Sequence, residues 1–151
     1  MTEQTSTVTA DGLTITRVFD APRQLVWNAW TDPAQFAQWF GGHEADVPLE
    51  TLSFDVRPGG RWNAVMHTQG AEIPWLGEFR EVDEPERLVL TMEDPEGSGN
   101  AEVLTVVLTE RDGKTEMFFS QLGGHLSEEQ YHQTVEGYAA FFAAMADVIA
   151  G

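Results

Sequence analysis

The sequence contains no cysteine, which excludes disulfide bonds and thiolate metal sites. Long hydrophobic runs are also missing: no stretch approaches the roughly 18 apolar residues of a membrane-spanning helix. The N-terminus, Thr2 to Ser6, is polar rather than signal-like. At 151 residues the chain is long enough for one domain with its own core. We therefore expect a single cytoplasmic domain with no membrane partner.

Basic residues are scarce. The chain has 8 Lys and Arg residues against 25 Asp and Glu residues, giving a net charge of −17, and Lys114 is its one lysine. A surface of this charge repels phosphate backbones and anionic lipid. The composition therefore argues against nucleic acid and membrane partners. A solvated surface tuned for solubility is its ordinary interpretation.

Signature motifs of phosphate, dinucleotide and zinc sites are absent too, with no Walker loop, G-x-G-x-x-G or H-E-x-x-H. The histidines are scattered along the chain. His43, Glu44 and Asp46 are close in sequence, but acidic loop residues are expected in so acidic a protein. The sequence therefore predicts no metal and no cofactor.

The C-terminal stretch carries the clearest pattern that is present. Apolar residues recur there at steps of four, three, four, three and four, which predicts one stripe of an α-helix over residues 127–150. Ser127 and Gln130 have the spacing of a capping box. The stripe needs a partner surface, since each large side chain gains roughly 1.5–3 kcal/mol on burial. It consists of Tyr131, Val135, Tyr138, Phe142, Met145 and Ile149.

The remainder predicts strands and tight turns. Residues 1–10 are expected to form a flexible tail, and residues 11–151 one domain. Asp20-Ala21-Pro22 and Asp32-Pro33 each begin a short helix. The apolar faces of these helices are Leu25, Val26, Ala29 and Trp30, then Phe36, Trp39 and Phe40. Period-two patterns predict seven strands, at 13–20, 50–57, 60–68, 73–82, 87–94, 102–110 and 114–121.

Two hairpins define which strand residues share a face. Asp112-Gly113 is a strong two-residue turn signal and pairs Arg111 with Lys114. A four-residue turn at 83–86 pairs Val82 with Arg87 and turns Glu81 inward, although a one-residue slip would invert each face. The expected cross-strand partners are Leu108 with Met117, Val106 with Phe119, Leu104 with Gln121, Phe79 with Leu90, and Gly77 with Met92.

Together these elements predict an α+β fold in which a seven-stranded antiparallel sheet wraps around a long C-terminal helix. Four segments carry a more specific resemblance: ITRVFDAPRQLVWNAWTDPAQFAQWFGG, DVRPGGRW, GEFREVDEPERLVLT and EGYAAFF. They closely resemble the bacterial family named after the C-terminal domain of the Hsp90 ATPase activator, within the START-like and Bet v 1-like (SRPBCC) helix-grip proteins. The resemblance covers Leu13 to Ala150. The chain departs from it at Gln121, where many members have histidine, and at Tyr138, where tryptophan is frequent.

The helix-grip resemblance implies a cavity between the curved sheet and the C-terminal helix. The many aromatic side chains are interpreted either as plain core or as the wall of that cavity, which would accept apolar ligands. Gln121, His125 and Tyr138 are the polar groups that would orient a ligand there. The candidate lining residues are Phe36, Trp39, Phe40, Trp62, Met66, Trp75, Phe79, Leu90, Met117, Phe119, Gln121, His125, Tyr138 and Phe142.

The first functional hypothesis is a non-enzymatic module, monomeric or weakly dimeric, that binds a small hydrophobic or amphipathic molecule. The second is a cyclase- or hydrolase-like enzyme, which requires a titratable side chain such as His125 or Glu81 inside the cavity. For these two residues the ordinary alternatives are a solvent-facing residue before the helix and a glutamate paired with an arginine. The third hypothesis is a co-chaperone-like interaction domain with a protein partner, which requires a contiguous exposed apolar patch.

Overall fold

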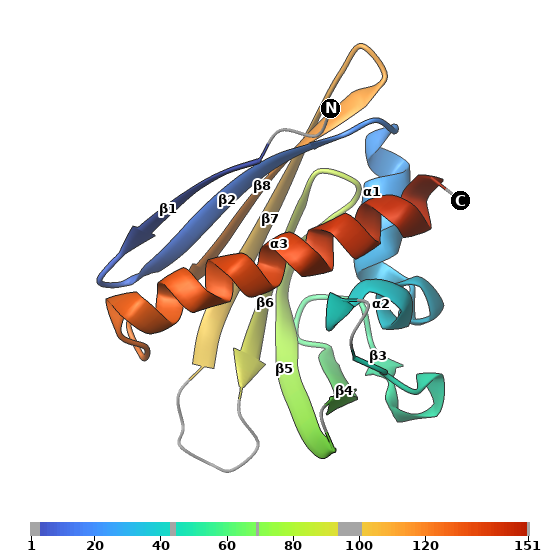
Figure 1. Cartoon of the computed structure of the whole chain (residues 1–151). Coiled ribbons are helices and arrows are strands. Elements are labelled where there is room, and N and C mark those ends of the chain that lie inside the picture. The colour runs from blue at the N-terminus through green and yellow to red at the C-terminus, as the bar shows by residue number, and fades with distance from the viewer. Residues whose placement is uncertain (1–3, 43–44, 69, 94–100, 151) are drawn as a thin grey trace.

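One antiparallel sheet of eight strands forms the larger layer of the protein, and helix α3 lies across one face of it (Figure 1). The computed structural model describes residues 4–42, 45–68, 70–93 and 101–150. The strand order is β1-β2-β8-β7-β6-β5-β4-β3. The strands are β1 (Gln4–Thr9), β2 (Gly12–Phe19), β3 (Ser53–Phe54), β4 (Arg61–Thr68), β5 (Ala71–Asp83), β6 (Arg87–Glu93), β7 (Ala101–Arg111) and β8 (Lys114–Leu122). The helices are α1 (Arg23–Thr31), α2 (Pro33–Trp39), the 3-10 turn η2 (Leu49–Thr51) and α3 (Glu128–Ala150).

Helix α3 begins with the capping box predicted from sequence. The Ser127 backbone N–H donates to Gln130 Oε1 over 2.8 Å, and the Gln130 N–H donates to Ser127 Oγ over 3.1 Å. Tyr131, Tyr138, Phe142 and Met145 of the predicted stripe are buried, while Val135 and Ile149 pack at its margin. The helix is thus held to the sheet by its apolar stripe. In the part of the chain that the structure describes, no helix has the length and hydropathy needed to cross a bilayer.

The hairpin of β7 and β8 has the predicted register. Arg111 pairs with Lys114 across Asp112-Gly113. Asp112 and Gly113 both have positive φ, at 53° and 78°, as a two-residue turn of this kind requires. The inward pairs are therefore those expected: Leu108 with Met117, Val106 with Phe119, and Leu104 with Gln121.

The hairpin of β5 and β6 differs from the prediction at its turn end. Val82 pairs with Leu88 rather than with Arg87, and a bulge between Phe79 and Glu81 then restores the predicted pairing of Phe79 with Leu90. One extra residue on β5 reverses the side that the following residues face. Glu81 consequently points to solvent and pairs with Arg87 over 3.3 Å. The inward position of Glu81 was wrong, and its ordinary alternative, an arginine pair, is confirmed.

Two other strand assignments need correction, and both concern sheet edges. Residues 4–9, expected in the tail, form β1, which pairs with β2 from Gln4–Arg17 to Thr9–Gly12. The expected strand at 50–57 is reduced to β3, preceded by η2. The sheet therefore has eight strands where seven were predicted. The long C-terminal helix, the antiparallel order and the two short helices agree with the prediction.

The two short helices start where the proline signals place them. Asp32 caps α2 by accepting from the Ala34 N–H over 3.0 Å, and Pro33 follows it at the first helical position. Gly41 and Gly42 follow α2 with positive φ, 94° and 74°, as the glycine pair predicts. In α1 the buried face contains Trp27, whereas Leu25, expected there, is exposed.

An aromatic cluster fills the space between α3, the sheet and the short helices. The Phe142 ring centroid lies 5.3 Å from that of Phe119, 6.1 Å from that of Trp30 and 6.2 Å from that of Trp39. Phe36 in turn contacts Trp39, with the two centroids 4.9 Å apart and the rings near edge-to-face. This arrangement adds favourable ring geometry to the gain from burial. Much of the predicted aromatic set is therefore packed core.

Candidate functional site

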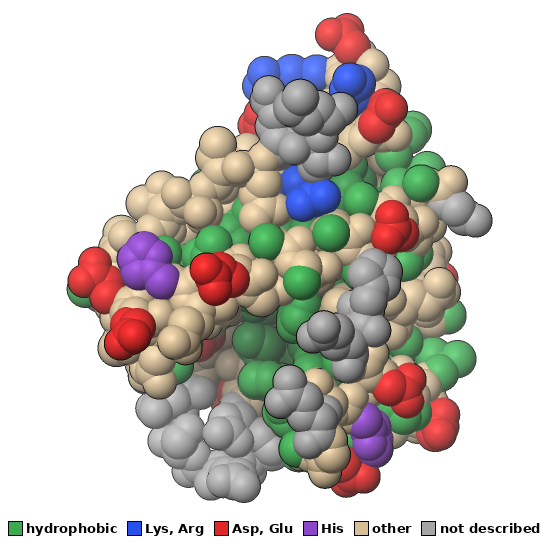
Figure 2. Space-filling model, in the orientation of Figure 1, with side chains coloured by type: hydrophobic (Ala, Val, Ile, Leu, Met, Phe, Trp, Pro, Cys, Tyr) green, Lys and Arg blue, Asp and Glu red, His purple; other side chains and the backbone are tan. Residues whose placement is uncertain are grey.

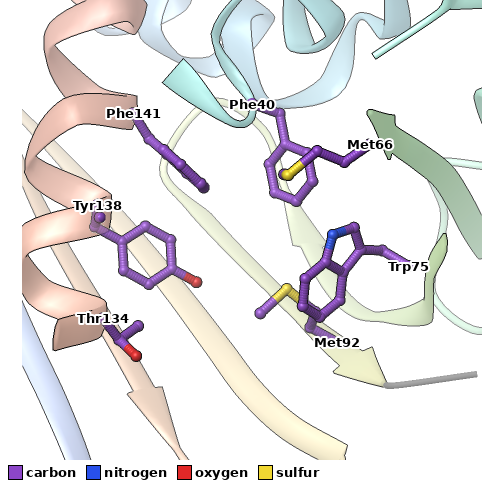
Figure 3. A pocket seen from close by; sticks show the side chains of 8 residues that line it. Phe40, Met66, Trp75, Met92, Thr134, Tyr138 and Phe141 are labelled. Carbon is purple, nitrogen blue, oxygen red and sulfur yellow. The ribbon is translucent and has the colours of Figure 1, made fainter. Parts of the chain in front are cut away.

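A pocket of about 190 Å³ lies between α3 and the strands β4, β5 and β6. Figure 3 shows residues of α3 on one side and residues of the strands, with Phe40 after α2, on the other. In the space-filling view, hydrophobic side chains are recessed beneath α3 at this place (Figure 2). The lining residues are Phe40, Met66, Trp75, Met92, Thr134, Gly137, Tyr138 and Phe141.

The two hydroxyl groups of the lining are already used inside the protein. Thr134 Oγ1 donates to the Gln130 carbonyl over 2.8 Å, as a helical threonine commonly does. Tyr138 Oη donates to Gln121 Oε1 over 2.6 Å. The wall is otherwise made of aromatic rings, thioethers and the bare backbone of Gly137. The pocket is therefore an apolar site in which polar contacts are few.

The residues that the sequence nominated as cavity lining fall into three groups. Phe40, Met66, Trp75 and Tyr138 line the pocket. Gln121 and His125 belong to a polar network beside it. The others are buried in the core and do not line this pocket: Phe36, Trp39, Trp62, Phe79, Leu90, Met117, Phe119 and Phe142.

Four lining residues were missed: Met92, Thr134, Gly137 and Phe141. Met92 had been placed on the inward face of its hairpin, which was a usable signal. Thr134, Gly137 and Phe141 flank the predicted stripe of α3, one position before Val135, Tyr138 and Phe142. An apolar stripe identifies the centre of a buried helix face, whereas the pocket lies at its edge.

A buried polar network runs from the pocket wall to the protein surface. Tyr138 bonds to Gln121, and Gln121 Nε2 donates to Glu102 Oε1 over 3.1 Å. Tyr131 Oη donates to the same oxygen over 2.9 Å. The other oxygen, Glu102 Oε2, lies 2.9 Å from His125 Nδ1. Three side chains from β8, α3 and the loop between them thus converge on one carboxylate of β7.

The network also orders the loop before α3. Tyr131 Oη accepts from the Gly124 N–H over 2.9 Å, and the Gly123 N–H donates to the Asp11 carbonyl over 3.0 Å. A Cβ atom on Gly123 would lie 1.7 Å from Glu102 Oε2, so any larger residue there would displace the carboxylate from its present position. Glu102 was not singled out from the sequence.

His125 is an exposed residue of the loop before α3, which was the ordinary alternative for it. Its side chain is 32% exposed and also bonds to Glu102. It does not line the pocket, and Glu81 on β5 is exposed. Among the residues that line the pocket, Tyr138 is the one ionisable group, and burial together with the charge of Glu102 raises its pKa. The one ionisable group among the lining residues is therefore protonated at neutral pH.

We expect both tyrosines to ionise at a higher pH in the folded protein than in the unfolded chain. Burial, and then the bond and charge of Glu102, raise the pKa of Tyr131, and burial and Glu102 raise that of Tyr138. These are the two tyrosines of the chain. A spectrophotometric titration should show less tyrosinate at pH 10 in the folded protein than in the unfolded chain, which is about half ionised there.

The raised pKa values of the two tyrosines determine how the stability of the folded protein changes at alkaline pH. Because the folded-state pKa values lie above the unfolded value, the stabilisation is complete below about pH 10 and is lost as pH rises above it. The free energy of unfolding should fall by up to roughly 1.4 kcal/mol per pH unit for each tyrosine. The burial of Tyr131 and Tyr138 would be contradicted if both were half ionised near pH 10 while circular dichroism showed that the protein was still folded.

No cluster of three or more potential metal ligands occurs in the ranges 4–42, 45–68, 70–93 and 101–150. The weak candidate of His43, Glu44 and Asp46 depends on two residues outside those ranges, since His43 and Glu44 are not among the described residues. Asp46 itself forms a bridge to His67 through backbone bonds on β4.

Residues 20–150 match the family model described as Activator of Hsp90 ATPase homolog 1-like protein. The chain belongs to this family. The match spans the short helices, strands β3 to β8 and helix α3, and it agrees with the resemblance that the sequence motifs carry. A search among curated proteins found no match.

Solved structures that are similar to this chain support the same fold. A Rhodobacter sphaeroides protein superposes with a TM-score of 0.83 at 18% identity, covering 98% of each chain. The Mycobacterium smegmatis protein Ms6760 gives 0.74 at 24% identity, covering 97% of this chain and 93% of that one. The AHSA1-like protein from Aeromonas hydrophila gives 0.71 at 18% identity, covering 99% and 92%. At these identities the comparison shows the fold alone.

Proposed function

We propose that this protein binds a small hydrophobic or amphipathic molecule in the pocket between α3 and strands β4 to β6. The observation that carries the proposal is the apolar pocket of about 190 Å³. An engineered apolar cavity of roughly 150 Å³ in another protein stays dry and binds benzene. A pocket of this size therefore suits a single aromatic ring or a short acyl chain.

The composition of the wall supports a binding role. Met66 and Met92 have unbranched, polarisable side chains that adapt to different shapes, and Phe40, Trp75 and Phe141 offer flat apolar surfaces. Helix-grip proteins of this family commonly bind hydrophobic ligands, although fold by itself does not select a function. The binding role therefore rests on the pocket of this chain.

The two alternatives have less support. An enzyme needs a titratable group in the pocket, but His125 and Glu81 lie outside it. An interaction domain needs a contiguous apolar patch. The large hydrophobic side chains that are exposed among the described residues come from three separate elements, α1, η2 and β8: Leu25, Leu49, Phe118 and Leu122. We therefore develop the binding role.

Filling the pocket from α3 tests the proposal. A Cβ atom on Gly137 would meet nothing within 4 Å, so a Gly137→Leu side chain extends into the pocket without a clash at its base. Leucine is also a better helix former than glycine by roughly 0.8 kcal/mol, so the helix should not be weakened. The matched control is Ala143→Leu, on the exposed face of the same helix.

Native mass spectrometry of freshly purified protein, followed by the denatured spectrum, detects a small molecule that is retained only by folded protein. A calorimetric titration with toluene, acetophenone and octanoate gives affinities. We expect at least one of these probes to bind wild type and Ala143→Leu equally, and Gly137→Leu at least tenfold more weakly. Equal binding by all three proteins, or no binding of any probe by wild type, would overturn the proposal.

A further inference from the structure

The indole N–H of Trp75 is a buried hydrogen-bond donor without a partner. In three other tryptophans the indole N–H has an acceptor within the protein. Trp39 Nε1 donates to the Ala29 carbonyl over 2.7 Å, Trp62 Nε1 to the Thr91 carbonyl over 2.8 Å, and Trp30 Nε1 approaches a thioether sulfur at 3.3 Å. Buried indole N–H groups nearly always find such partners. An unpaired one therefore requires an explanation.

The unpaired donor belongs to the pocket wall. Trp75 lines the pocket, and Figure 3 shows its nitrogen on the ring edge that faces Phe40 and Met66. The Phe40 ring stands nearly perpendicular to the indole, at 84° with a centroid separation of 6.5 Å, and an aromatic face is only a weak acceptor. The one unsatisfied side-chain donor at the pocket is therefore the indole nitrogen.

We propose that the molecule held in this pocket carries a neutral hydrogen-bond acceptor, a ketone or ester carbonyl oxygen, that accepts from Trp75 Nε1. This inference rests on the proposed function and adds the chemical class of the ligand. Apolar sites generally fix the orientation of their ligands through a few placed polar groups. Here both wall hydroxyls already donate within the protein, which leaves Trp75 as the free donor.

Access to the nitrogen requires a side chain to move. The atom is closed off from water by its neighbours, so an acceptor reaches it only when one of them gives way. Met66 lies beside Trp75 in the pocket wall and has three rotatable bonds. Rotation of the Met66 thioether is the movement that we expect to open a path to the nitrogen.

The acceptor is neutral because the site offers a carboxylate no compensation. No lysine, arginine or histidine is among the lining residues, and the chain carries a net charge of −17. Burial of an unpaired carboxylate in an apolar site is strongly unfavourable. A carbonyl oxygen needs only one donor, and Trp75 supplies it. The preferred ligand is thus an apolar ring or short chain with a carbonyl group.

The test compares two probes of the same shape, acetophenone and α-methylstyrene, which differ in a C=O against a C=CH₂ group. Trp75→Phe keeps an aromatic ring and removes the N–H. We expect the variant to bind acetophenone roughly tenfold more weakly than wild type, while its affinity for α-methylstyrene changes less than threefold. Benzoate should bind wild type at least tenfold more weakly than acetophenone. For each probe, the affinity of Trp75→Phe is compared with that of wild type. Because this comparison is made within one probe, the different hydrophobicities of the two probes do not affect it.

A spectroscopic readout on wild-type protein does not depend on the folding of the variant. Five indole N–H signals are expected, and the one that disappears in Trp75→Phe belongs to Trp75. Acetophenone should move this signal downfield, and α-methylstyrene should not. Equal losses of affinity for the two probes, or an unmoved Trp75 signal with acetophenone bound, would overturn the inference and leave the proposed function standing. Absence of binding by both probes would overturn the inference, and the proposed function falls with it only if toluene and octanoate also fail to bind.

Discussion

Replacing Phe119 by alanine should lower the free energy of unfolding by about 3–5 kcal/mol. Phe119 is completely buried on β8, and its ring centroid lies 4.6 Å from that of Tyr138 and 5.3 Å from that of Phe142. These large rings come from α3 and cannot close over the vacated space without distorting the helix. The loss therefore includes a cavity term in addition to the lost burial. Denaturant unfolding measures it directly, and the midpoint temperature should fall by roughly 6–20 °C.

The neighbouring residue gives a matched control. Phe118 is the same residue type on the same strand, but it faces the opposite side of the sheet and is 40% exposed. Phe118→Ala should cost about 1 kcal/mol or less, because solvent replaces the ring. Equal costs for the two variants would contradict the register in which Val106 faces Phe119, since a one-residue slip of β8 exchanges the two faces.

This register was predictable because a single strong turn determined it. Asp112-Gly113 leaves two residues between β7 and β8, and the alternation of apolar residues on both strands agrees with that turn. The β5–β6 hairpin had no comparable signal, and the extra residue at the bulge near Arg80 cannot be read from alternation. The register was therefore correct on one side of the bulge and wrong on the other.

Strand β1 was missed for a different reason. Its sequence, QTSTVT, is polar and exposed, and contains one large apolar residue, Val8, which packs against the core. Its pairing is provided by the backbone of β2, from Gln4–Arg17 to Thr9–Gly12. An edge strand of this kind exists because a neighbouring strand has free backbone groups, and these leave no mark in its own side-chain pattern. Propensity alone therefore suggested a tail.

The candidate site was predictable only in outline. Period-two patterns correctly separated inward from outward residues, but they do not show which inward residues leave a gap. Phe40, Met66 and Trp75 border the pocket, while Phe79 and Phe119, with equally apolar sequence contexts, are packed core. The difference depends on where the stripe of α3 ends relative to the sheet, which is a property of the whole fold.

The sequence pattern of β7 indicated that Glu102 faces inward, but its charge suggested a surface position. It stands two residues before Leu104 and four before Val106, so the strand pattern places it on the inward face. In a chain with 25 acidic residues, an acid was expected at the surface. The inward position and the three donors that satisfy the carboxylate came from the structure.

Removing that carboxylate should have the second large effect. Glu102→Ala should lower the free energy of unfolding by about 2–4 kcal/mol, because Tyr131 and Gln121 are left buried without their acceptor. Bonds to a charged group contribute about 1.5–3 kcal/mol each, and the released cost of burying the carboxylate offsets part of the loss. Denaturant unfolding gives the size of the effect. Hydrogen exchange should locate it at the loop of Gly123 and Gly124 and the first turn of α3.

Glu81→Ala is the matched control. Glu81 is also a strand glutamate with a basic partner, but its side chain is 57% exposed and that of Arg87 is 44% exposed, with 3.3 Å between the paired atoms. An exposed pair of this kind contributes about 0–1 kcal/mol, so the variant should unfold within roughly 0.5 kcal/mol of wild type. If Glu102→Ala were as mild as Glu81→Ala, the carboxylate would have to be solvated, and the network would not connect the pocket wall to the loop before α3. A large loss for Glu102→Ala with a small one for Glu81→Ala would show that burial, rather than ion pairing as such, decides the stabilisation.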